Sequence, residues 1–200
     1  AGGGRTGGYR AAERRVSGIM ISAPERLKLK ICMAGEAMVG KTSLIRRYVT
    51  DEYEDRYTAT LGTKITKKSL TASHPKDGRC LDADLILWDI MGTPTLRELL
   101  KEAYYHGTHG ILGVVDVTRK ETLQELDSWS HSIRTVAGSI PTYVVVNKAD
   151  LVGQSQLDRE MIDAFCRERG YPWSFTSART GSGVEEAFNG LVRQILLGRP

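Results

Sequence analysis

The 200-residue sequence contains only three cysteines, and no two of them form a CxxC pair. Cysteines this few and this scattered exclude a disulfide framework and a zinc cluster, and they are typical of a reducing, cytosol-like compartment. The sequence also lacks any apolar run close to eighteen residues, which excludes a transmembrane helix, and it begins without the continuous apolar segment of a secretory signal. We therefore expect a cytoplasmic protein, with peripheral contact to membranes as the open alternative.

Positive charge is concentrated near the N-terminus. Residues 1–26 contain five arginines and two glutamates, so they contribute +3 of the net charge of +4. The other 23 basic and 22 acidic residues nearly cancel, and we expect no specific nucleic-acid partner for them. Residues 1–22 carry six glycines and no amphipathic period, which predicts disorder. We assign residues 1–26 to this Gly/Arg-rich tail, for which a basic arm that binds nucleic acid or anionic lipid is the alternative, and residues 27–200 to one domain.

Strand-like and helix-like segments alternate along residues 27–197. Apolar alternation and β-branched runs predict strands, whereas apolar residues three and four positions apart predict helices. Because strands that alternate with helices pair in parallel and are covered on both faces, we expect a three-layer α/β/α fold with a six-stranded sheet. Residues 61–90 read as a hairpin, which adds one antiparallel edge strand. The predicted strands cover residues 27–34, 61–72, 83–90, 110–117, 142–146 and 173–176, and the predicted helices cover 41–49, 96–105, 122–137, 158–169 and 184–197.

A phosphate-binding loop is predicted directly after the first strand. Residues 35–42 read GEAMVGKT, which fits GxxxxGK[ST] at every fixed position between a strand and a helix and so disfavours a chance glycine turn. The glycines allow backbone N–H groups to face an anion, Lys41 can reach the β- and γ-phosphates, and the Thr42 hydroxyl can ligate Mg²⁺. The residues assigned to the phosphates are Gly35, Glu36, Ala37, Met38, Val39, Gly40, Lys41, Thr42 and Ser43.

The tetrapeptide NKAD at residues 147–150 is predicted to bind a base, and the phosphate loop that precedes it in the chain disfavours the alternative of a polar turn. It follows a buried strand, and parallel sheets bind ligands at the carboxyl ends of their strands. The carboxylate of Asp150 can accept both the N1–H and the N2–H of guanine, a paired donor edge that adenine lacks. Lys148 can lay its aliphatic stem on the purine, and the Asn147 amide can hold neighbouring loops. A second short segment, whose backbone N–H groups can meet the guanine O6, consists of Ser177, Ala178 and Arg179.

Five ordered motifs make the chain resemble the Ras-superfamily small GTPases, with most similarity to the Rab branch. They are GEAMVGKT at 35–42, YTATLGTK at 57–64, WDIMG at 88–92, NKAD at 147–150 and TSA at 176–178. Residues 104–118 are similar to the Rab segment after the second switch, and the resemblance covers residues 27–197. It implies a P-loop G domain that binds GTP or GDP with Mg²⁺ and acts as a molecular switch. The partners implied are effectors, exchange factors and GTPase-activating proteins, and we expect a monomer.

The resemblance also implies roles for residues in the two switch segments. Thr60 would ligate Mg²⁺ and contact the γ-phosphate, beside Thr42, while Asp89 would hold a Mg²⁺-bound water. Tyr53 matches the family's aromatic residue that packs on guanine, and Tyr57 matches one that can close over the phosphates. The metal-binding residues implied are therefore Thr42, Thr60 and Asp89.

The segment after Asp89 departs from the family's pattern. The backbone N–H of Gly92 would contact the γ-phosphate. Loss of this phosphate would then release both switch segments, the one around Thr60 and the one around Gly92. The family usually has Gln next, to orient the attacking water, but this chain has Thr93, whose hydroxyl is shorter, and Ala37 adds a methyl group where Gly or Ser is common. We expect slow GTP hydrolysis, with a nucleotide-locked guanine-binding scaffold as the alternative. The residues assigned to catalysis are Lys41, Thr60, Gly92 and Thr93.

Two further departures concern the hairpin and the end of the sequence. The stretch from residue 61 to residue 89 is longer than in typical Rab proteins, which predicts an extended hairpin loop at 74–81. The sequence ends at Pro200 without a C-terminal cysteine, so we expect that membrane association by prenylation is not encoded in it.

Overall fold

The computed structural model describes residues 25–54, 60, 62–90 and 101–199, which form one sheet between helices. The strands are β1 (Glu25–Ala34), β2 (Thr63–Ser73), β3 (Cys80–Ile90), β4 (Gly110–Asp116), β5 (Thr142–Asn147) and β6 (Trp173–Phe175). The helices are α1 (Lys41–Thr50), α3 (Glu121–Ala137), α4 (Arg159–Arg169) and α5 (Val184–Leu197), with a short 3₁₀ turn η1 (Val152–Gln154). The six strands pair in the order β2-β3-β1-β4-β5-β6, all in parallel except β2, which runs antiparallel to β3 at the edge. The predicted α/β class and the antiparallel edge strand are confirmed.

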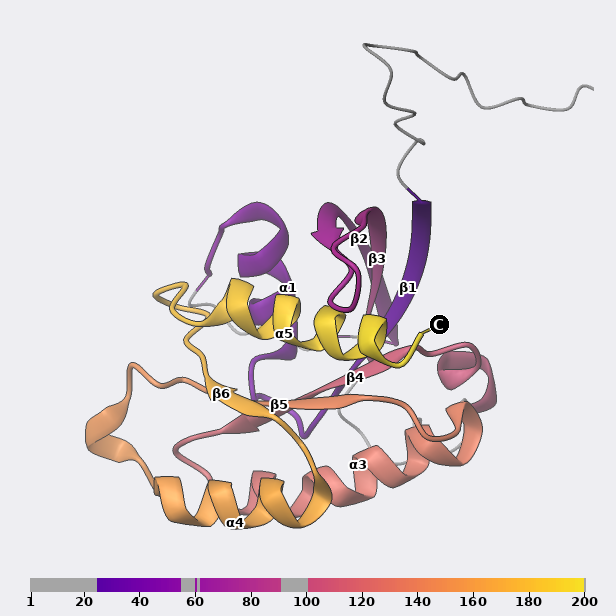
Figure 1. Ribbon diagram of the computed structural model, residues 1–200. Coiled ribbons are helices and arrows are strands. Elements are labelled where there is room, and N and C mark those ends of the chain that lie inside the picture. Colours follow the sequence, from indigo (N-terminus) through magenta and orange to yellow (C-terminus); the bar gives the residue numbers. More distant parts are fainter. Residues whose placement is uncertain (1–24, 55–59, 61, 91–100, 200) are drawn as a thin grey trace, which may run out of the picture.

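Helices cover both faces of the sheet, as Figure 1 shows. One apolar cluster joins α1 and α5 to the sheet, and within it the rings of Tyr48 and Phe188 stack with centroids 4.0 Å apart. A second cluster joins α3 and α4 to the opposite face, through Trp129 and Ile162. Because each large apolar side chain buried in this way contributes about 1.5–3 kcal/mol, the two clusters hold the helices in fixed positions over the sheet.

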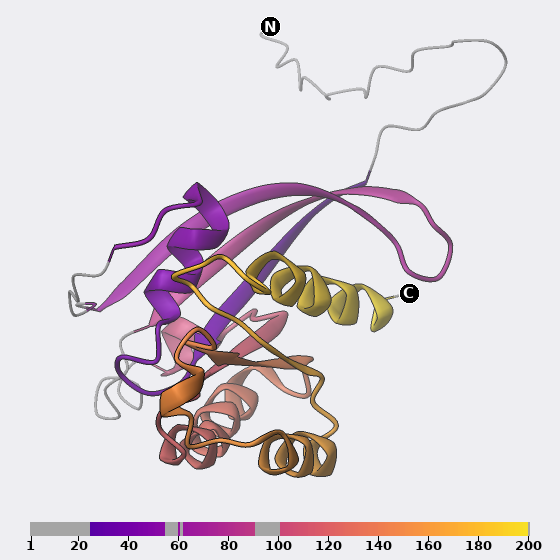
Figure 2. The ribbon, with the colours of Figure 1, turned by 90° about the vertical axis from the view of Figure 1, so that its left-hand side faces the viewer.

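The hairpin of β2 and β3 differs from the expected one. Its register begins at Thr63 opposite Ile90 and ends at Ser73 opposite Cys80. The turn therefore covers residues 74–79, two fewer than the expected loop over 74–81, because β3 begins at Cys80. The reason is that polar and apolar residues keep alternating to the ends of both segments, so pairing continues. The hairpin projects past the end of α5 (Figure 2).

Two other predicted boundaries can be compared with the structure. β1 begins at Glu25, two residues inside the segment assigned to the tail, because it pairs with the lengthened β3 as far as Leu81. Of the helix predicted over 96–105, residues 101–105 are helical, and the rest lie outside the described residues. Within the described ranges, no helix combines the length and the apolar character needed to cross a bilayer.

The five parallel strands end at the same edge of the sheet. Four of these ends carry polar side chains, which are Asp89 of β3, Asp116 of β4, Asn147 of β5 and Thr176 directly after β6, while β1 ends in the glycine loop 35–40. Crevices at the carboxyl ends of parallel strands are the usual ligand sites of open α/β sheets. This edge is therefore where the predicted motifs meet.

Candidate functional site

Two glycines shape the loop after β1. Gly35 has a φ of +135° and Gly40 a φ of +101°, conformations that side chains rarely adopt. A Cβ atom on Gly35 would lie 2.2 Å from the carbonyl oxygen of Val114, and one on Gly40 would lie 2.3 Å from Nδ2 of Asn147. The loop thus packs so closely against β4 and the end of β5 that only glycine fits at either position.

Lys41 is the buried cation of this loop. Its Nζ donates hydrogen bonds to the carbonyl oxygens of Gly35, at 2.7 Å, and Glu36, at 2.8 Å, and the residue is only 6% exposed. Burial lowers the pKa of Lys41 to about 8, although the carboxylates of Asp89 and Glu36 act in the opposite direction. A phosphate beside this ammonium would compensate the charge that burial destabilises, so the loop favours an anionic ligand.

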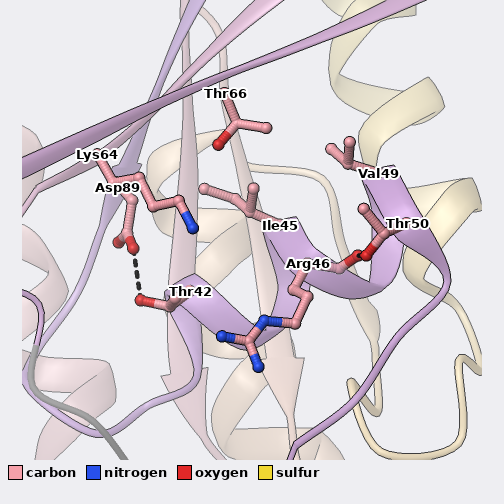
Figure 3. A pocket seen from close by; sticks show the side chains of 8 residues that line it. All are labelled: Thr42, Ile45, Arg46, Val49, Thr50, Lys64, Thr66 and Asp89. Carbon is pink, nitrogen blue, oxygen red and sulfur yellow. Dashed lines mark hydrogen bonds between the residues drawn. The ribbon is translucent and has the colours of Figure 1, made fainter.

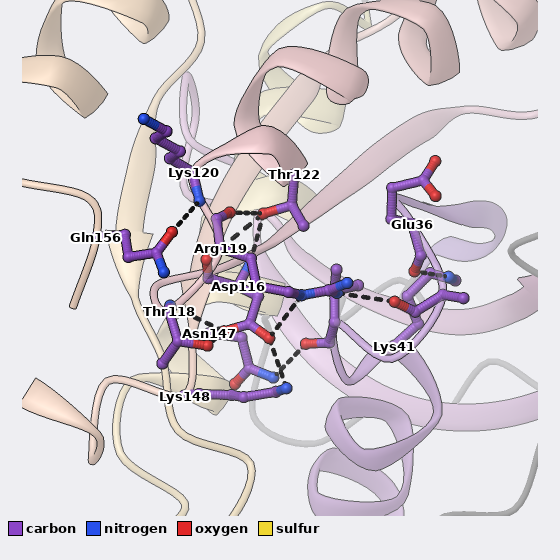
Figure 4. Close-up of polar contacts among 12 residues, drawn as sticks. Glu36, Lys41, Asp116, Thr118, Arg119, Lys120, Thr122, Asn147, Lys148 and Gln156 are labelled. Carbon is purple, nitrogen blue, oxygen red and sulfur yellow. Dashed lines mark hydrogen bonds and ion pairs between the residues drawn. The ribbon is translucent and has the colours of Figure 1, made fainter. Parts of the chain in front are cut away.

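Two carbonyl groups of the loop bond away from its centre. Arg119 Nη2 donates to the Ala37 carbonyl at 2.8 Å, and Asn147 Nδ2 donates to the Val39 carbonyl at 2.9 Å (Figure 4). Since the C=O and N–H of a trans peptide point in opposite directions, these bonds turn the N–H groups of the next residues, Met38 and Gly40, to the other side. Together with the N-terminal end of the α1 dipole, these N–H groups can hold an anion.

Two threonines and an aspartate converge beside the first turn of α1. The Thr42 hydroxyl donates to the carboxylate of Asp89 (Figure 3), and it lies 2.9 Å from the hydroxyl oxygen of Thr60. Asp89 is 1% exposed, and its Oδ1 has no hydrogen-bond partner among the described residues. Burial raises the pKa of Asp89, against the hydrogen bond from Thr42. Hydroxyl and carboxylate oxygens are ligands that Mg²⁺ prefers, so these residues fit the predicted ion.

Asn147 joins the phosphate side of the site to the base side. Its side chain is almost fully buried, and besides donating to Val39 it accepts hydrogen bonds at Oδ1 from Ala178 N, at 3.2 Å, and Thr176 Oγ1, at 3.3 Å. The loops that follow β1, β5 and β6 therefore meet on one amide. The structure places Asn147 as the sequence interpretation expects, between neighbouring loops.

Asp150 lies at the surface beside the predicted second base segment. The Ser177 hydroxyl donates to Asp150 Oδ1 at 2.6 Å, and it accepts from the backbone N–H of Thr180 at 3.1 Å. Ser177 and Ala178 are buried, whereas Arg179 is exposed. The two base-binding segments are thus brought together, with a carboxylate held in a defined orientation at their junction.

Asp116 is a site residue that the sequence interpretation missed. It ends β4, is 1% exposed, and accepts from Lys148 Nζ at 2.5 Å and from Arg119 Nε at 3.3 Å (Figure 4). Burial disfavours its charge, but hydrogen bonds from Lys148 and Thr118 outweigh burial and hold the pKa of Asp116 below its usual range. Through Arg119, which also binds Ala37, this carboxylate connects the NKAD motif to the phosphate loop. An aspartate at the carboxyl end of a buried strand was the signal that could have revealed it.

The side chain of Glu36 is engaged away from the loop. The indole Nε1 of the buried Trp129 in α3 donates to Glu36 Oε1 at 3.0 Å. Glu36 was assigned to the phosphates, and only its backbone is suited to that role, because a carboxylate would repel them.

The remaining predicted residues fall at the margins of the site. Ser43 is half-buried in the first turn of α1, and Tyr53 is 37% exposed just after that helix. Three assigned residues lie outside the described part of the chain, namely Tyr57, Gly92 and Thr93.

Comparison with known proteins agrees with this geometry. The sequence profile of the Ras family matches residues 30–197. The Ras-related protein RABD2c of Arabidopsis thaliana is 32% identical over 167 residues, which are 83% of this chain and 79% of that protein. The Ras-related protein Rab-13 of Bos taurus is 30% identical over 84% of this chain and 80% of its own length. The GTP-binding protein ypt4 of Schizosaccharomyces pombe is 32% identical over 84% of this chain and 71% of its own length. The chain therefore belongs to the Ras family, as a Rab-like small GTPase.

Proposed function

We propose that this small GTPase binds GTP or GDP together with Mg²⁺ and switches through the segments around Thr60 and Gly92. The observation that carries the proposal is the meeting of two kinds of site at one sheet edge. An anion cradle after β1 and a carboxylate beside two short loops share one buried amide, that of Asn147, which is bonded to Val39 and Ala178. A ligand that fits both ends has phosphates and a guanine base.

The chemistry proposed is phosphoryl transfer to water, in which the protein mainly positions groups and stabilises charge. Lys41 would neutralise charge on the phosphate oxygens, while backbone N–H groups of the loop hold those oxygens in place. Thr42, Thr60 and Asp89 would hold Mg²⁺, which when bound neutralises charge that develops on the phosphates. Asp150 would select guanine by accepting its two adjacent N–H groups.

Hydrolysis by the isolated protein should be slow. Thr93 stands where the family usually has a glutamine that orients the attacking water. Its hydroxyl is on a shorter side chain and has its donor and acceptor on one atom, whereas the amide has them on two. We propose a rate near the intrinsic Ras rate of ~10⁻⁴ s⁻¹ or below. A second candidate, favoured by the same residue and by Ala37, is a scaffold that holds guanine nucleotide without useful hydrolysis.

Two measurements on the purified chain test these proposals. Mass analysis of the nucleotide that copurifies should identify GDP or GTP, and competition should show preference for GDP over ADP in magnesium buffer. Failure to retain guanine nucleotide, or equal affinity for ADP, would overturn the proposed function. Single-turnover hydrolysis, with and without a cell lysate, separates the slow switch from the nucleotide-locked scaffold.

Partners follow from the same proposal. The segment after α1 and the region around Gly92 would change with the nucleotide, and proteins that read these segments would be effectors, exchange factors and GTPase-activating proteins. We propose that the chain acts as a monomer, in the cytoplasm or peripherally at membranes.

A further inference from the structure

Arg47, in the last turn of α1, belongs to none of the sequence motifs, yet its guanidinium bonds in two directions. Toward the loop between β6 and α5, Nε donates to the Ala178 carbonyl at 2.9 Å and Nη2 donates to the Arg179 carbonyl at 2.9 Å. Toward the end of its own helix, Nη1 donates to the carbonyl oxygen of Asp51 at 2.8 Å and to its Oδ1 at 3.0 Å. The Arg47 side chain is only 16% exposed, and its bond to Ala178 is partly buried, whereas its bonds to Arg179 and to the 91% exposed Asp51 lie at the surface.

The two carbonyls that Arg47 binds lie in the predicted base segment, 131 and 132 positions away in sequence. The N–H of Ala178 bonds to Asn147 while its C=O bonds to Arg47, so this residue is held from both sides. Asn147 alone leaves the far side of the segment unsupported, since its amide contacts Thr176 and Ala178 but not Arg179. Arg47 therefore adds a support from α1 to those that Asn147 and Asp150 give the segment.

Building on the function proposed above, we propose that Arg47 is a positioning residue for guanine recognition. The planar guanidinium offers donors in a rigid fork, so one side chain can serve two adjacent carbonyls while a third nitrogen anchors it to Asp51. Arg47 thereby fixes the peptide group that joins Ala178 to Arg179. The N–H of this peptide can meet the guanine O6, while the N–H groups of Ser177 and Ala178 bond to Ser182 and Asn147. Asp51 begins the stretch that leads to Tyr53 and Thr60, so the same guanidinium ties the base segment to the start of the first switch.

A purely structural role would have a different consequence. Arginine in the last turn of a helix interacts favourably with the free carbonyl groups and with the helix dipole. If Arg47 did only this, its loss would destabilise the folded protein and lower the affinity for every ligand equally. A positioning role instead predicts a loss that depends on the base, because only a base with a 6-carbonyl uses the Arg179 N–H that Arg47 orients.

The test compares two ligands that differ at this carbonyl and at the neighbouring N1–H. The N1–H difference is read by Asp150, which is the same in every variant, so it cancels when affinity ratios are compared between variants. GDP and the 5′-diphosphate of 2-aminopurine riboside, which lacks the 6-carbonyl, compete with a fluorescent GDP analogue on wild type, Arg47→Ala, Arg47→Lys and Arg46→Ala. Arg46→Ala is the matched control, because Arg46 is the neighbouring residue in α1 and forms an ion pair with Glu54 rather than with the base segment. Thermal unfolding of each variant is measured in parallel.

In Arg47→Ala, GDP affinity should fall on the order of tenfold to thirtyfold, and affinity for the 2-aminopurine diphosphate by roughly twofold or less. Arg47→Lys keeps the charge but not the fork, so it should show the same base-dependent loss even if the alanine variant does not fold. Arg46→Ala should leave the ratio of the two affinities unchanged.

An equal loss for both ligands, or a ratio unchanged in Arg47→Lys, overturns the positioning role. If the wild type binds neither ligand, the proposed function itself fails and this inference falls with it. If the wild type binds GDP but the Arg47 variants lose affinity for both ligands equally, the inference about Arg47 fails and the proposed function stands.

Discussion

Replacing Asn147 by alanine is expected to separate the phosphate half of the site from the base half. The change removes three hydrogen bonds, to Val39 O at 2.9 Å, Ala178 N at 3.2 Å and Thr176 Oγ1 at 3.3 Å. At about 1 kcal/mol net for each bond the loss is about 3 kcal/mol. It approaches about 6 kcal/mol if the Val39 carbonyl and the Ala178 N–H stay buried without partners, since each such group costs about 1–3 kcal/mol.

If the whole loss falls on the nucleotide-bound state, GDP affinity decreases by a factor of about 10² to 10⁴. Any part of the loss that falls on the nucleotide-free protein lowers its thermal stability instead. The rate of release of a fluorescent GDP analogue measures the loss of nucleotide binding, and thermal unfolding without nucleotide measures the loss of stability. Asn147→Asp is the informative companion, because a carboxylate still accepts from Ala178 but cannot donate to Val39. GDP release within threefold of wild type, with unchanged unfolding, would refute the idea that this amide joins the two halves.

Three further predictions address single groups of the site. Asp150→Asn should shift preference from guanosine toward xanthosine nucleotides, because xanthine has a carbonyl where guanine has an amine; competition binding with XDP checks it, and unchanged selectivity counts against Asp150 as the base reader. Arg119→Ala, which frees the Ala37 carbonyl, should speed GDP release by roughly fivefold to tenfold, whereas Lys120→Ala, a change at the exposed neighbour, should not. With a pKa of about 8 in the free protein, Lys41 loses its proton as the pH rises. Because a phosphate binds the protonated amine, GDP affinity measured from pH 7 to pH 9 should fall above pH 8, and a flat Lys41→Met profile is the control.

Much of the fold and the motif positions followed from local sequence alone. Gly35 and Gly40 predicted the turn of the phosphate loop because backbone conformation at positive φ depends on residue type at that position. The buried run of β4 predicted a central parallel strand because a sheet covered on both faces needs apolar side chains on both. The antiparallel edge strand was likewise predicted, although the length of its partner β3 was underestimated by three residues, since the extent of pairing depends on both strands.

Other features of the site were decided only by the tertiary structure. The bond from Lys148 to Asp116 joins residues 32 positions apart, and the bond from Arg119 to Ala37 joins residues 82 positions apart. The bonds from Arg47 to the base segment span 131 and 132 positions. No local pattern predicts such pairs, because their geometry depends on how the helices and strands pack rather than on the propensity of any segment. The sequence alone therefore predicted which residues would meet a nucleotide, and the packing of α1, β4 and the loop before α5 decided which side chains hold those residues in place.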